Sequence, residues 1–336
     1  MRFTIKTNNT NIALDKNNSG ADYLFVSHAH SDHISGIKTA SKIISSSETA
    51  DIIKAAYHID ITYKISIPKG IELLNAGHIL GAKQLYMEDN ENGFSLLYTG
   101  DFQTYKQKTV EQITPKNADI LVIDSTYPSP KIKFEDRDKV EHDIQTWSLE
   151  KLKTGIVLFS AYAVGKAQEL TSILNDCGIV PIVSRKINDI NKVYNKFGSN
   201  LEYVSAYDGE NSFEDAFVGN FVGITDSRNV EDLGFRLSKI YGKKVHTAVA
   251  TGMSKIFSFK VEKAFEFSDH ADFYQSLEYI EAVNPKLVAT FGHNSELFAR
   301  NLRAESLNAI PFSELECNGI SIAKSRILNT TIIDSI

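Results

Sequence analysis

The chain has 336 residues, of which 42% are hydrophobic and 23% are charged, a composition that excludes a disordered or fibrous protein. Its length predicts one elaborated domain or two. The 36 Lys and Arg residues against 42 Asp and Glu give a formal net charge of −6, which excludes a broadly basic nucleic-acid coat, so nucleic-acid binding would need a local basic patch or bound metal ions.

Cys177 and Cys317 lie far apart and outside any CxxC motif, so neither a disulfide framework nor a zinc ribbon is expected. The N-terminal residues lack the apolar core of a signal peptide. No apolar run approaches the roughly 20 residues that cross a bilayer. We therefore expect a cytoplasmic protein that does not contact membranes.

The first third of the chain consists of short apolar runs separated by polar loops. The expected strands are 23–26, 71–74, 85–87, 94–98 and 118–123. Asn92-Gly93 predicts a hairpin turn between two of them. Helical spacing is clear in 49–56, and Asp32 is a candidate start for a second helix. The pattern predicts a strand-rich sandwich with functional residues at strand ends.

The middle of the chain alternates between strand and helix patterns. The expected helices are 140–151, 165–176, 186–196 and 233–240, and the expected strands are 156–159, 179–183, 221–225 and 245–249. This alternation predicts a parallel α/β sheet. Short strands return after residue 259, with one helix over 272–282. We expect an α/β protein whose outer domain, residues 1–146 and 259–336, is interrupted by a parallel α/β domain, residues 147–258.

A histidine-rich segment, Ser27-His28-Ala29-His30-Ser31-Asp32-His33, follows the first of these strands directly. In an extended chain His28 and His30 project to the same side, so both can bind one metal ion. Asp32 and His33 follow where the chain turns, and they point toward a second position. Nitrogen and oxygen ligands suit Zn²⁺ or Mn²⁺, and a cation offsets the cost of burying these groups. The alternative is a solvated histidine-rich loop, which the preceding strand and the embedded aspartate disfavour.

The sequence His-Ala-His-Ser-Asp-His at 28–33 resembles the HxHxDH signature of the metallo-β-lactamase fold superfamily. Two later segments are similar to the next metal motifs of that superfamily: His78 in Ala-Gly-His-Ile-Leu-Gly and Asp101 in Tyr-Thr-Gly-Asp-Phe. The resemblance implies an αββα sandwich with its ligands at strand ends.

Further segments resemble the β-CASP nucleases, and the resemblance extends over about residues 20–300. Asp124 in Ile-Asp-Ser-Thr-Tyr is similar to motif A, His270 in Ser-Asp-His-Ala-Asp to motif B, and His293 in Phe-Gly-His-Asn to motif C, which usually reads Thr-His-Gly. The segment Gly165-Lys166-Ala-Gln-Glu resembles the start of the domain inserted in that family. In length and local sequence the chain is most similar to short archaeal β-CASP exonucleases and bacterial ligase-associated DNA exonucleases.

The resemblance implies two divalent metal ions per chain, with Zn²⁺ favoured and Mn²⁺ open. The ligands of one ion would be His28, His30, His78 and Asp101. The ligands of the other would be Asp32, His33, Asp101 and His293. His270 would act as the general acid and Asp124 would orient it; with Asp32, these are the expected catalytic residues.

Basic residues in the middle of the chain are candidates for substrate binding: Lys166, Lys255, Arg185 and Arg228. Lys166 opens an expected helix, whose N–H groups can bind phosphate, although an ordinary helix start is an equal alternative. Arg185 and Arg228 each follow a strand, where ligand-binding loops occur in parallel sheets. Asp269 and Asp272 flank His270 and either tune it or cap the next helix.

The implied function is a two-metal nuclease that acts on single-stranded RNA or DNA, as a 3'–5' exonuclease. An endoribonuclease of the RNA 3'-end-processing type, a different hydrolase of the same fold, and an inactive scaffold are the alternatives. The other hydrolases typically lack motif A and the inserted domain, and inactive members lose ligands that this chain keeps. Single-stranded nucleic acid is the expected partner; a homodimer and protein partners in processing or repair are left open.

Overall fold

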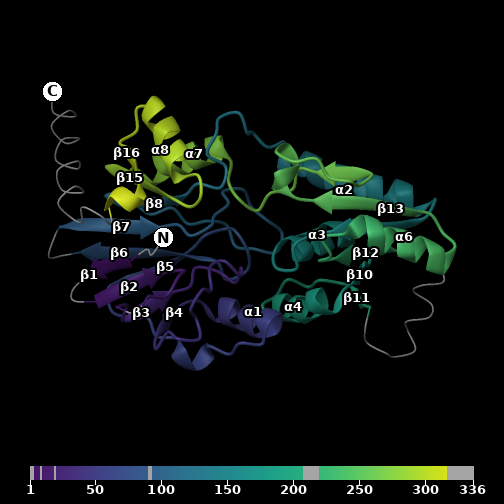
Figure 1. Ribbon diagram of the computed structural model, residues 1–336, viewed down its shortest axis with the longest axis horizontal. Helices are drawn as coiled ribbons and strands as arrows, with labels where there is room; N and C mark the ends of the chain where they lie inside the picture. Colours follow the sequence, from purple (N-terminus) through teal and green to yellow (C-terminus); the bar gives the residue numbers. More distant parts are fainter. Residues whose placement is uncertain (1–3, 8–9, 19, 90–92, 207–218, 316–336) are drawn as a thin grey trace.

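The computed structural model describes residues 4–7, 10–18, 20–89, 93–206 and 219–315. Figure 1 shows two lobes: the first contains the N-terminal third and the last described elements, and the second contains the middle of the chain. The predicted fold class is confirmed, because a strand-rich sandwich is interrupted by a parallel α/β layer. No helix in the described ranges combines the length and apolar character that crossing a bilayer requires.

The first lobe contains two facing sheets. The smaller has the order β1-β2-β3-β4, with bounds Thr4–Thr7, Thr10–Leu14, Tyr23–Phe25 and Ile43–Ile44. The larger is mixed and has the order β16-β15-β8-β7-β6-β5, with bounds Ala309–Pro311, Leu287–Phe291, Ile120–Asp124, Phe94–Tyr98, Lys83–Asp89 and Ile71–Asn75. Phe25 and Tyr98 meet edge to face between the sheets, with ring centroids 6.0 Å apart.

Helices cover the outer faces of both sheets (Figure 1). Leu24, beside Phe25 on β3, points to the opposite face because strand side chains alternate, and it shares a core with Ile52 and Ile53 of α1, Ser47–Tyr57. Helices α7, Phe273–Val283, and α8, Ser295–Ala304, cover the larger sheet. The result is an αββα sandwich. Two short 3₁₀ helices, η1 Thr62–Lys64 and η2 Gly252–Lys255, lie in connections.

The second lobe is built on an entirely parallel sheet. Its order is β11-β10-β12-β9-β13-β14, with bounds Val204–Ser205, Ile182–Val183, Val222–Thr225, Ile156–Ser160, Val245–Ala250 and Lys263–Phe265. Its helices are α2 Arg137–Leu152, α3 Lys166–Asn175, α4 Arg185–Lys196 and α6 Val230–Tyr241. Strand β14 pairs with β13 although it follows the expected boundary at residue 258. The domain limits 1–146, 147–258 and 259–336 stay a prediction.

Two expectations about helices are wrong. Asp32 does not start a helix, because residues 31–39 form turns and bends. Gly36 has φ +77°, and a Cβ there would clash with Asn17 Cβ at 2.7 Å. The C-terminal part contains α8 besides the single helix expected there, and its buried Phe298 and Leu302, four residues apart, are a signal for it. Strands β6 and β7 pair antiparallel as predicted, while residues 90–92 of the expected turn lie outside the described residues.

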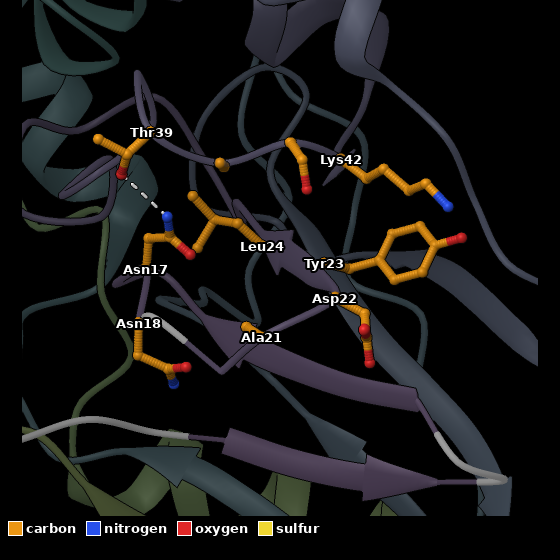
Figure 2. Close-up of a pocket in the computed structure, with 10 residues that line it drawn as sticks. Asn17, Asn18, Ala21, Asp22, Tyr23, Leu24, Thr39 and Lys42 are labelled. Carbon is orange, nitrogen blue, oxygen red and sulfur yellow. Dashed lines mark hydrogen bonds between the residues drawn. The ribbon is translucent and has the colours of Figure 1, made fainter.

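A surface pocket lies beside the start of β3 (Figure 2). Its polar groups already have partners: Asn17 Nδ2 donates to Thr39 Oγ1 at 3.0 Å, and Lys42 Nζ lies 5.1 Å from the centroid of the Tyr23 ring. None of the candidate site residues lines this pocket. The predicted ligands His28, His78, Asp101 and His293 each follow the carboxyl end of a strand of the first lobe.

Candidate metal centre

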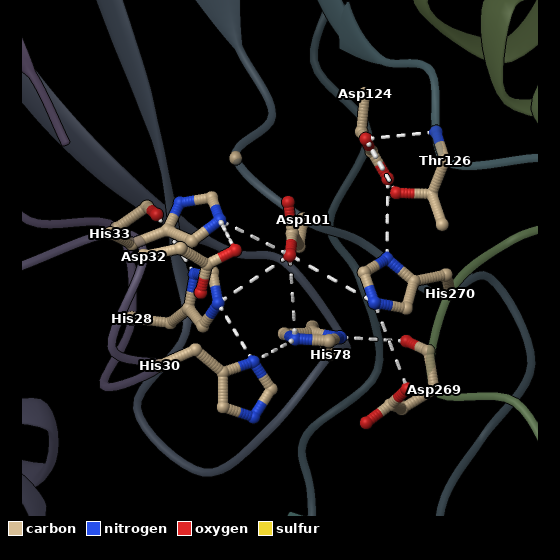
Figure 3. Close-up of polar contacts among 12 residues, drawn as sticks. His28, His30, Asp32, His33, His78, Asp101, Asp124, Thr126, Asp269 and His270 are labelled. Carbon is tan, nitrogen blue, oxygen red and sulfur yellow. Dashed lines mark hydrogen bonds and ion pairs between the residues drawn. The ribbon is translucent and has the colours of Figure 1, made fainter. Parts of the chain in front are cut away.

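Four of the predicted ligands converge where β3, β5 and β7 end (Figure 3). One ligand atom from each of His28, His30, His78 and Asp101 lies within 4.8 Å of the other three. Asp101 Oδ2 is 3.5 Å from His28 Nε2 and 3.8 Å from His78 Nε2. We refer to these four residues as the His–Asp cluster.

Glycines directly before two of the ligands allow the loops to come this close. Gly77, before His78, has φ +75°, and a Cβ there would lie 2.2 Å from the Gln103 carbonyl oxygen. Gly100, before Asp101, has φ +56°, and its Cβ would lie 2.7 Å from Ser27 Cβ. Any other residue would be strained at both positions and would push the ligand loops apart.

Hydrogen bonds outside the cluster assign the tautomers of its histidines. His78 Nδ1 is 2.7 Å from the Asp269 carbonyl, and His30 Nε2 is 3.2 Å from the Val164 carbonyl. A carbonyl only accepts, so both nitrogens carry the proton. His28 Nδ1 lies 2.9 Å from Ser27 Oγ, which donates its own proton to Asp15, so this nitrogen is also the donor.

The remaining nitrogens therefore point lone pairs into the cluster. His30 Nδ1 is 3.1 Å from His28 Nε2 and 3.2 Å from His78 Nε2, and no proton is left to bridge them. Burial lowers the pKa of His78 to about 3 and also lowers that of His28 and His30, which keeps the rings neutral. Three converging lone pairs and a carboxylate repel one another unless a cation lies between them. The donor set fits a divalent metal ion.

His33 and Asp32 lie on another side of Asp101. His33 Nε2 is 3.4 Å from Asp101 Oδ2 and 3.7 Å from Asp32 Oδ2, and the Asp32 side chain is 80% exposed. Burial lowers the pKa of His33, but the carboxylates of Asp101 and Asp15 outweigh it and raise that pKa well above its usual value. His293, the seventh predicted ligand, is exposed in the turn after β15 and belongs to none of the groups that could bind a metal ion within the described residues.

Asp15 is a buried residue that the sequence analysis missed. Its carboxylate accepts from Ser27 N at 2.7 Å, Ser27 Oγ at 2.8 Å, Tyr98 Oη at 2.7 Å and His33 Nδ1 at 2.9 Å. It thereby orients His33 directly and His28 through Ser27. The available signal was a carboxylate at the exit of the apolar run 12–14. Outer hydrogen bonds of this kind fix the ring orientation of metal ligands.

His270 and Asp124 form a pair beside the cluster. His270 Nδ1 lies 3.2 Å from Asp124 Oδ2, while Nε2 faces Asp101 Oδ2 at 3.9 Å (Figure 3). Thr126 holds the other carboxylate oxygen through its N–H at 3.0 Å and its hydroxyl at 2.9 Å. Burial lowers the pKa of His270, but Asp101 and Asp124 outweigh it and raise the value to about 9. The ring is thus oriented to donate a proton from Nε2 toward the cluster.

Lys166 is not placed to bind a substrate phosphate as predicted. Its side chain is 6% exposed and forms an ion pair with Asp269 Oδ1. Burial opposes ionisation of Asp269, but the Lys166 ammonium holds the pKa of that carboxyl well below its usual range. The pair joins α3 of the second lobe to the segment that carries His270. Asp272 takes the capping alternative: its carboxylate accepts from the N–H groups of Tyr274 and Gln275 at the start of α7.

The other predicted substrate-binding residues lie at the carboxyl edge of the parallel sheet or close to it. Arg185 begins α4 after β10, and Arg228 follows β12; both side chains are exposed. Lys255 is partly exposed and pairs with Glu266 Oε2 at 2.8 Å.

Comparison with known proteins gives sequence relatives, whereas no family model matches the chain. It is 32% identical over 304 residues to a probable DNA ligase of Opitutus terrae, an alignment that covers 86% of this chain and 28% of the ligase. An Acidianus ambivalens protein named "Uncharacterized protein in lig 3'region" is 37% identical over 144 residues, 41% of this chain and 98% of that protein. An RNase J-like protein of Methanocaldococcus jannaschii is 30% identical over 199 residues, half of this chain and 46% of that protein.

Proposed function

The chain belongs to the β-CASP nuclease family of the metallo-β-lactamase fold, and from that premise we propose that it is a metal-dependent phosphodiesterase that cuts single-stranded RNA or DNA. The chain spans 28% of the ligase and 46% of the RNase J-like protein that it resembles, so activity and substrate are inferred for this chain on its own residues.

One observation carries the proposal: the His–Asp cluster lies directly beside the His270–Asp124 pair. Asp101 Oδ2 is 3.5 Å from His28 Nε2 and 3.9 Å from His270 Nε2, so a ligand position and a proton donor share one small space. Phosphodiester hydrolysis needs both functions, because the attacking water must lose a proton and the leaving oxygen must gain one.

The His–Asp cluster would hold one divalent ion, and Asp32, His33 and Asp101 would contribute to a second. Such ions, when bound, lower the pKa of a water and offset phosphate charge. Zn²⁺ is the first choice for these ligands and Mn²⁺ the second. His293 stays a predicted seventh ligand.

His270 would protonate the leaving oxygen from Nε2, and Asp124 would hold the ring through Nδ1. The hydrogen bond of 3.2 Å to Asp124 fixes a proton on Nδ1, and the pKa of about 9 keeps a second proton on Nε2, which is the proton that the ring can donate. The two Thr126 contacts fix Asp124 in turn. Asp32, exposed at the edge of the cluster, is a predicted catalytic residue that can reach an incoming water or substrate.

The chain has a net charge of −6, so few basic residues are available to contact phosphates. We therefore propose a single strand as the substrate. Arg185 and Arg228 remain the proposed basic contacts, because both are exposed at the carboxyl edge of the parallel sheet, whereas Lys166 is buried. With few phosphates neutralised, binding should depend weakly on salt. Digestion from the 3' end is proposed from resemblance to the short archaeal and ligase-associated members. The cellular role proposed with it is nucleic-acid processing or repair in the cytoplasm.

A degradation time course with end-labelled RNA and DNA, each with Zn²⁺ or Mn²⁺, tests the proposal. A 5'-labelled strand should shorten as a ladder, while a 3'-labelled strand should release mononucleotide at once. Efficient cutting of a circular single strand would instead show endonuclease action. Release of label only from the 5' end would reverse the polarity. If neither nucleic acid is cut with either metal, the proposed function is wrong.

Metal content tests the ligand assignment independently of activity. Protein purified without chelator should contain about two equivalents of divalent metal, as in two-metal phosphodiesterases. The double variant His28→Ala, Asp101→Ala should lose most of it. His142→Ala, which removes an exposed histidine on α2, serves as the control and should keep the wild-type content. If the double variant keeps the wild-type metal content, the assignment of His28 and Asp101 as ligands is wrong.

A further inference from the structure

Tyr162 is an exposed aromatic residue on the loop between β9 and α3. Its relative exposure is 56%, whereas Ala161, Ala163 and Val164 beside it are 6%, 7% and 4% exposed. A single exposed tyrosine is common on protein surfaces, so its significance depends on where it lies and how firmly it is held.

The Tyr162 loop contacts the candidate site directly. The Val164 carbonyl accepts from His30 Nε2 at 3.2 Å. Lys166 Nζ lies 4.7 Å from the centroid of the Tyr162 ring and pairs with Asp269, whose Oδ1 is 3.8 Å from His270 Nε2. These contacts place the Tyr162 ring at the rim of the site, between the two lobes.

The backbone under the ring is fixed by hydrogen bonds. Ala167 N donates to the Tyr162 carbonyl at 3.1 Å, and Gln168 Nε2 donates to the Ala163 carbonyl at 3.1 Å. Gly165 N donates to Gln168 Oε1 at 2.8 Å. Gly165 has φ +85°, and a Cβ there would clash with Ile79 Cγ2 at 2.3 Å. A ring on such a preorganised loop loses little conformational entropy when it binds a flat partner.

The same edge of the sheet offers a phosphate contact. Tyr162 follows β9 and Arg228 follows β12. These two strands are parallel neighbours, so both residues lie at the carboxyl edge of the sheet. Ser160 Oγ donates to the Ser227 carbonyl at 2.9 Å, which holds the two connections side by side. A single strand alternates bases and phosphates, so the Tyr162 ring could stack on a base while the neighbouring Arg228 guanidinium contacts a phosphate.

We propose that Tyr162 is a positioning residue that stacks on one unpaired base of the substrate and thereby holds the strand over the His–Asp cluster. The inference rests on the proposed function, and it assigns recognition to the flat face of a base, which RNA and DNA share. It predicts weak sequence preference, because every base presents a π-face.

Binding of fluorescent single-stranded oligonucleotides tests this, with RNA and DNA measured separately. The His270→Ala protein is the parent, so that the strand survives the measurement. Adding Tyr162→Ala should weaken binding by about 5- to 150-fold, the range for loss of one stacked base. Tyr162→Phe should bind like the parent, because the ring is kept. Oligonucleotides with abasic nucleotides should bind the parent and the Tyr162→Ala protein equally.

Phe235→Ala is a matched control. Phe235 on α6 is 60% exposed and has Lys239 Nζ 4.4 Å from its ring centroid, the same local chemistry without a contact to the site. Its loss should leave binding unchanged. Equal affinity of parent and Tyr162→Ala proteins, an equal loss with Phe235→Ala, or no measurable binding by the parent would overturn the inference. Failure of the wild-type protein to cut any strand is a separate result that concerns the proposed function.

Discussion

At the scale of single residues, the two ring nitrogens of His270 have different partners: Nε2 faces Asp101 in the His–Asp cluster, and Nδ1 is held by Asp124. Substitution by alanine should retain metal and lower turnover by about 10²- to 10⁴-fold, the usual range for a general acid. Single-turnover cleavage and metal analysis on the same sample check this. A near-normal rate would remove His270 from catalysis, whereas loss of metal would make it a ligand.

Asp15 is a buried carboxylate that orients two of the predicted ligands, His33 directly and His28 through Ser27. In Asp15 one oxygen accepts from Ser27 Oγ, Tyr98 Oη and His33 Nδ1, and the other accepts from Ser27 N. Asp15→Asn keeps the size but replaces one of these oxygens by an N–H donor, which leaves the donors on that side without an acceptor. We expect a loss of about 10- to 100-fold in metal affinity or activity, as for other outer-shell changes at metal sites. Titration of metal-free protein with Zn²⁺ measures the affinity. An unchanged Kd would show that the Asp15 contacts do not orient His33 and His28.

At the scale of elements, the Asp272 carboxylate both caps the start of α7 and binds the segment around Phe134. Oδ1 accepts from Tyr274 N at 2.9 Å and Gln275 N at 3.0 Å, and Oδ2 accepts from Phe134 N at 2.9 Å. Asp272→Ala should lower the free energy of unfolding by about 1–3 kcal/mol, because it removes a helix cap and leaves the part-buried Phe134 N–H without its acceptor.

Urea denaturation measures the Asp272→Ala effect against a second cap. Asp136, which caps α2 through Lys139 N at 3.2 Å, is more exposed and makes no bond to another segment through its carboxylate. Asp136→Ala should therefore destabilise less, by about 0.5–1 kcal/mol. Equal effects would mean that the bond from Phe134 contributes nothing.

At the scale of the whole molecule, the buried Lys166–Asp269 pair joins the second lobe to the segment that carries His270. Lys166→Met should cost about 3–5 kcal/mol, because it leaves a buried carboxylate without its counter-ion. The double change Lys166→Met, Asp269→Asn should recover much of the loss, since no buried charge remains. Thermal unfolding followed by circular dichroism gives the comparison.

The exposed pair of Lys54 with Asp60 is the control for this experiment, and Lys54→Met should shift the melting temperature much less. A Lys166→Met protein with the melting temperature of the wild type would show that the lobes do not depend on the pair. The lobes also meet where α1 packs on α4, and there Lys196 Nζ pairs with Asp51 Oδ2 at 2.5 Å.

The sequence by itself determined the elements with strong periodicity and the positions of the four predicted ligands that converge in the His–Asp cluster. The alternation of strands and helices over 140–249 is a local property, so the parallel sheet could be expected from it. His28, His30, His78 and Asp101 were each found in a short segment at a strand end, and they lie together because strand ends meet at one edge of the sandwich. The helix expected to start at Asp32 does not form, because the positive φ of Gly36 and its closeness to Asn17 favour turns there.

Only the tertiary structure decided which charged groups face the site and which face each other. Lys166 looks like a phosphate contact in the sequence, but Asp269, 103 residues away, binds its ammonium group. Nothing in the sequence around Asp15 marks it as part of the site, because its partner Tyr98, whose hydroxyl donates to it at 2.7 Å, is 83 residues away. His293 sits in a motif-like segment and yet its side chain is exposed. The physical reason is the same in all of these cases: a local pattern records residue type and spacing, while the partner that neutralises a charge or orients a ring comes from distant parts of the chain.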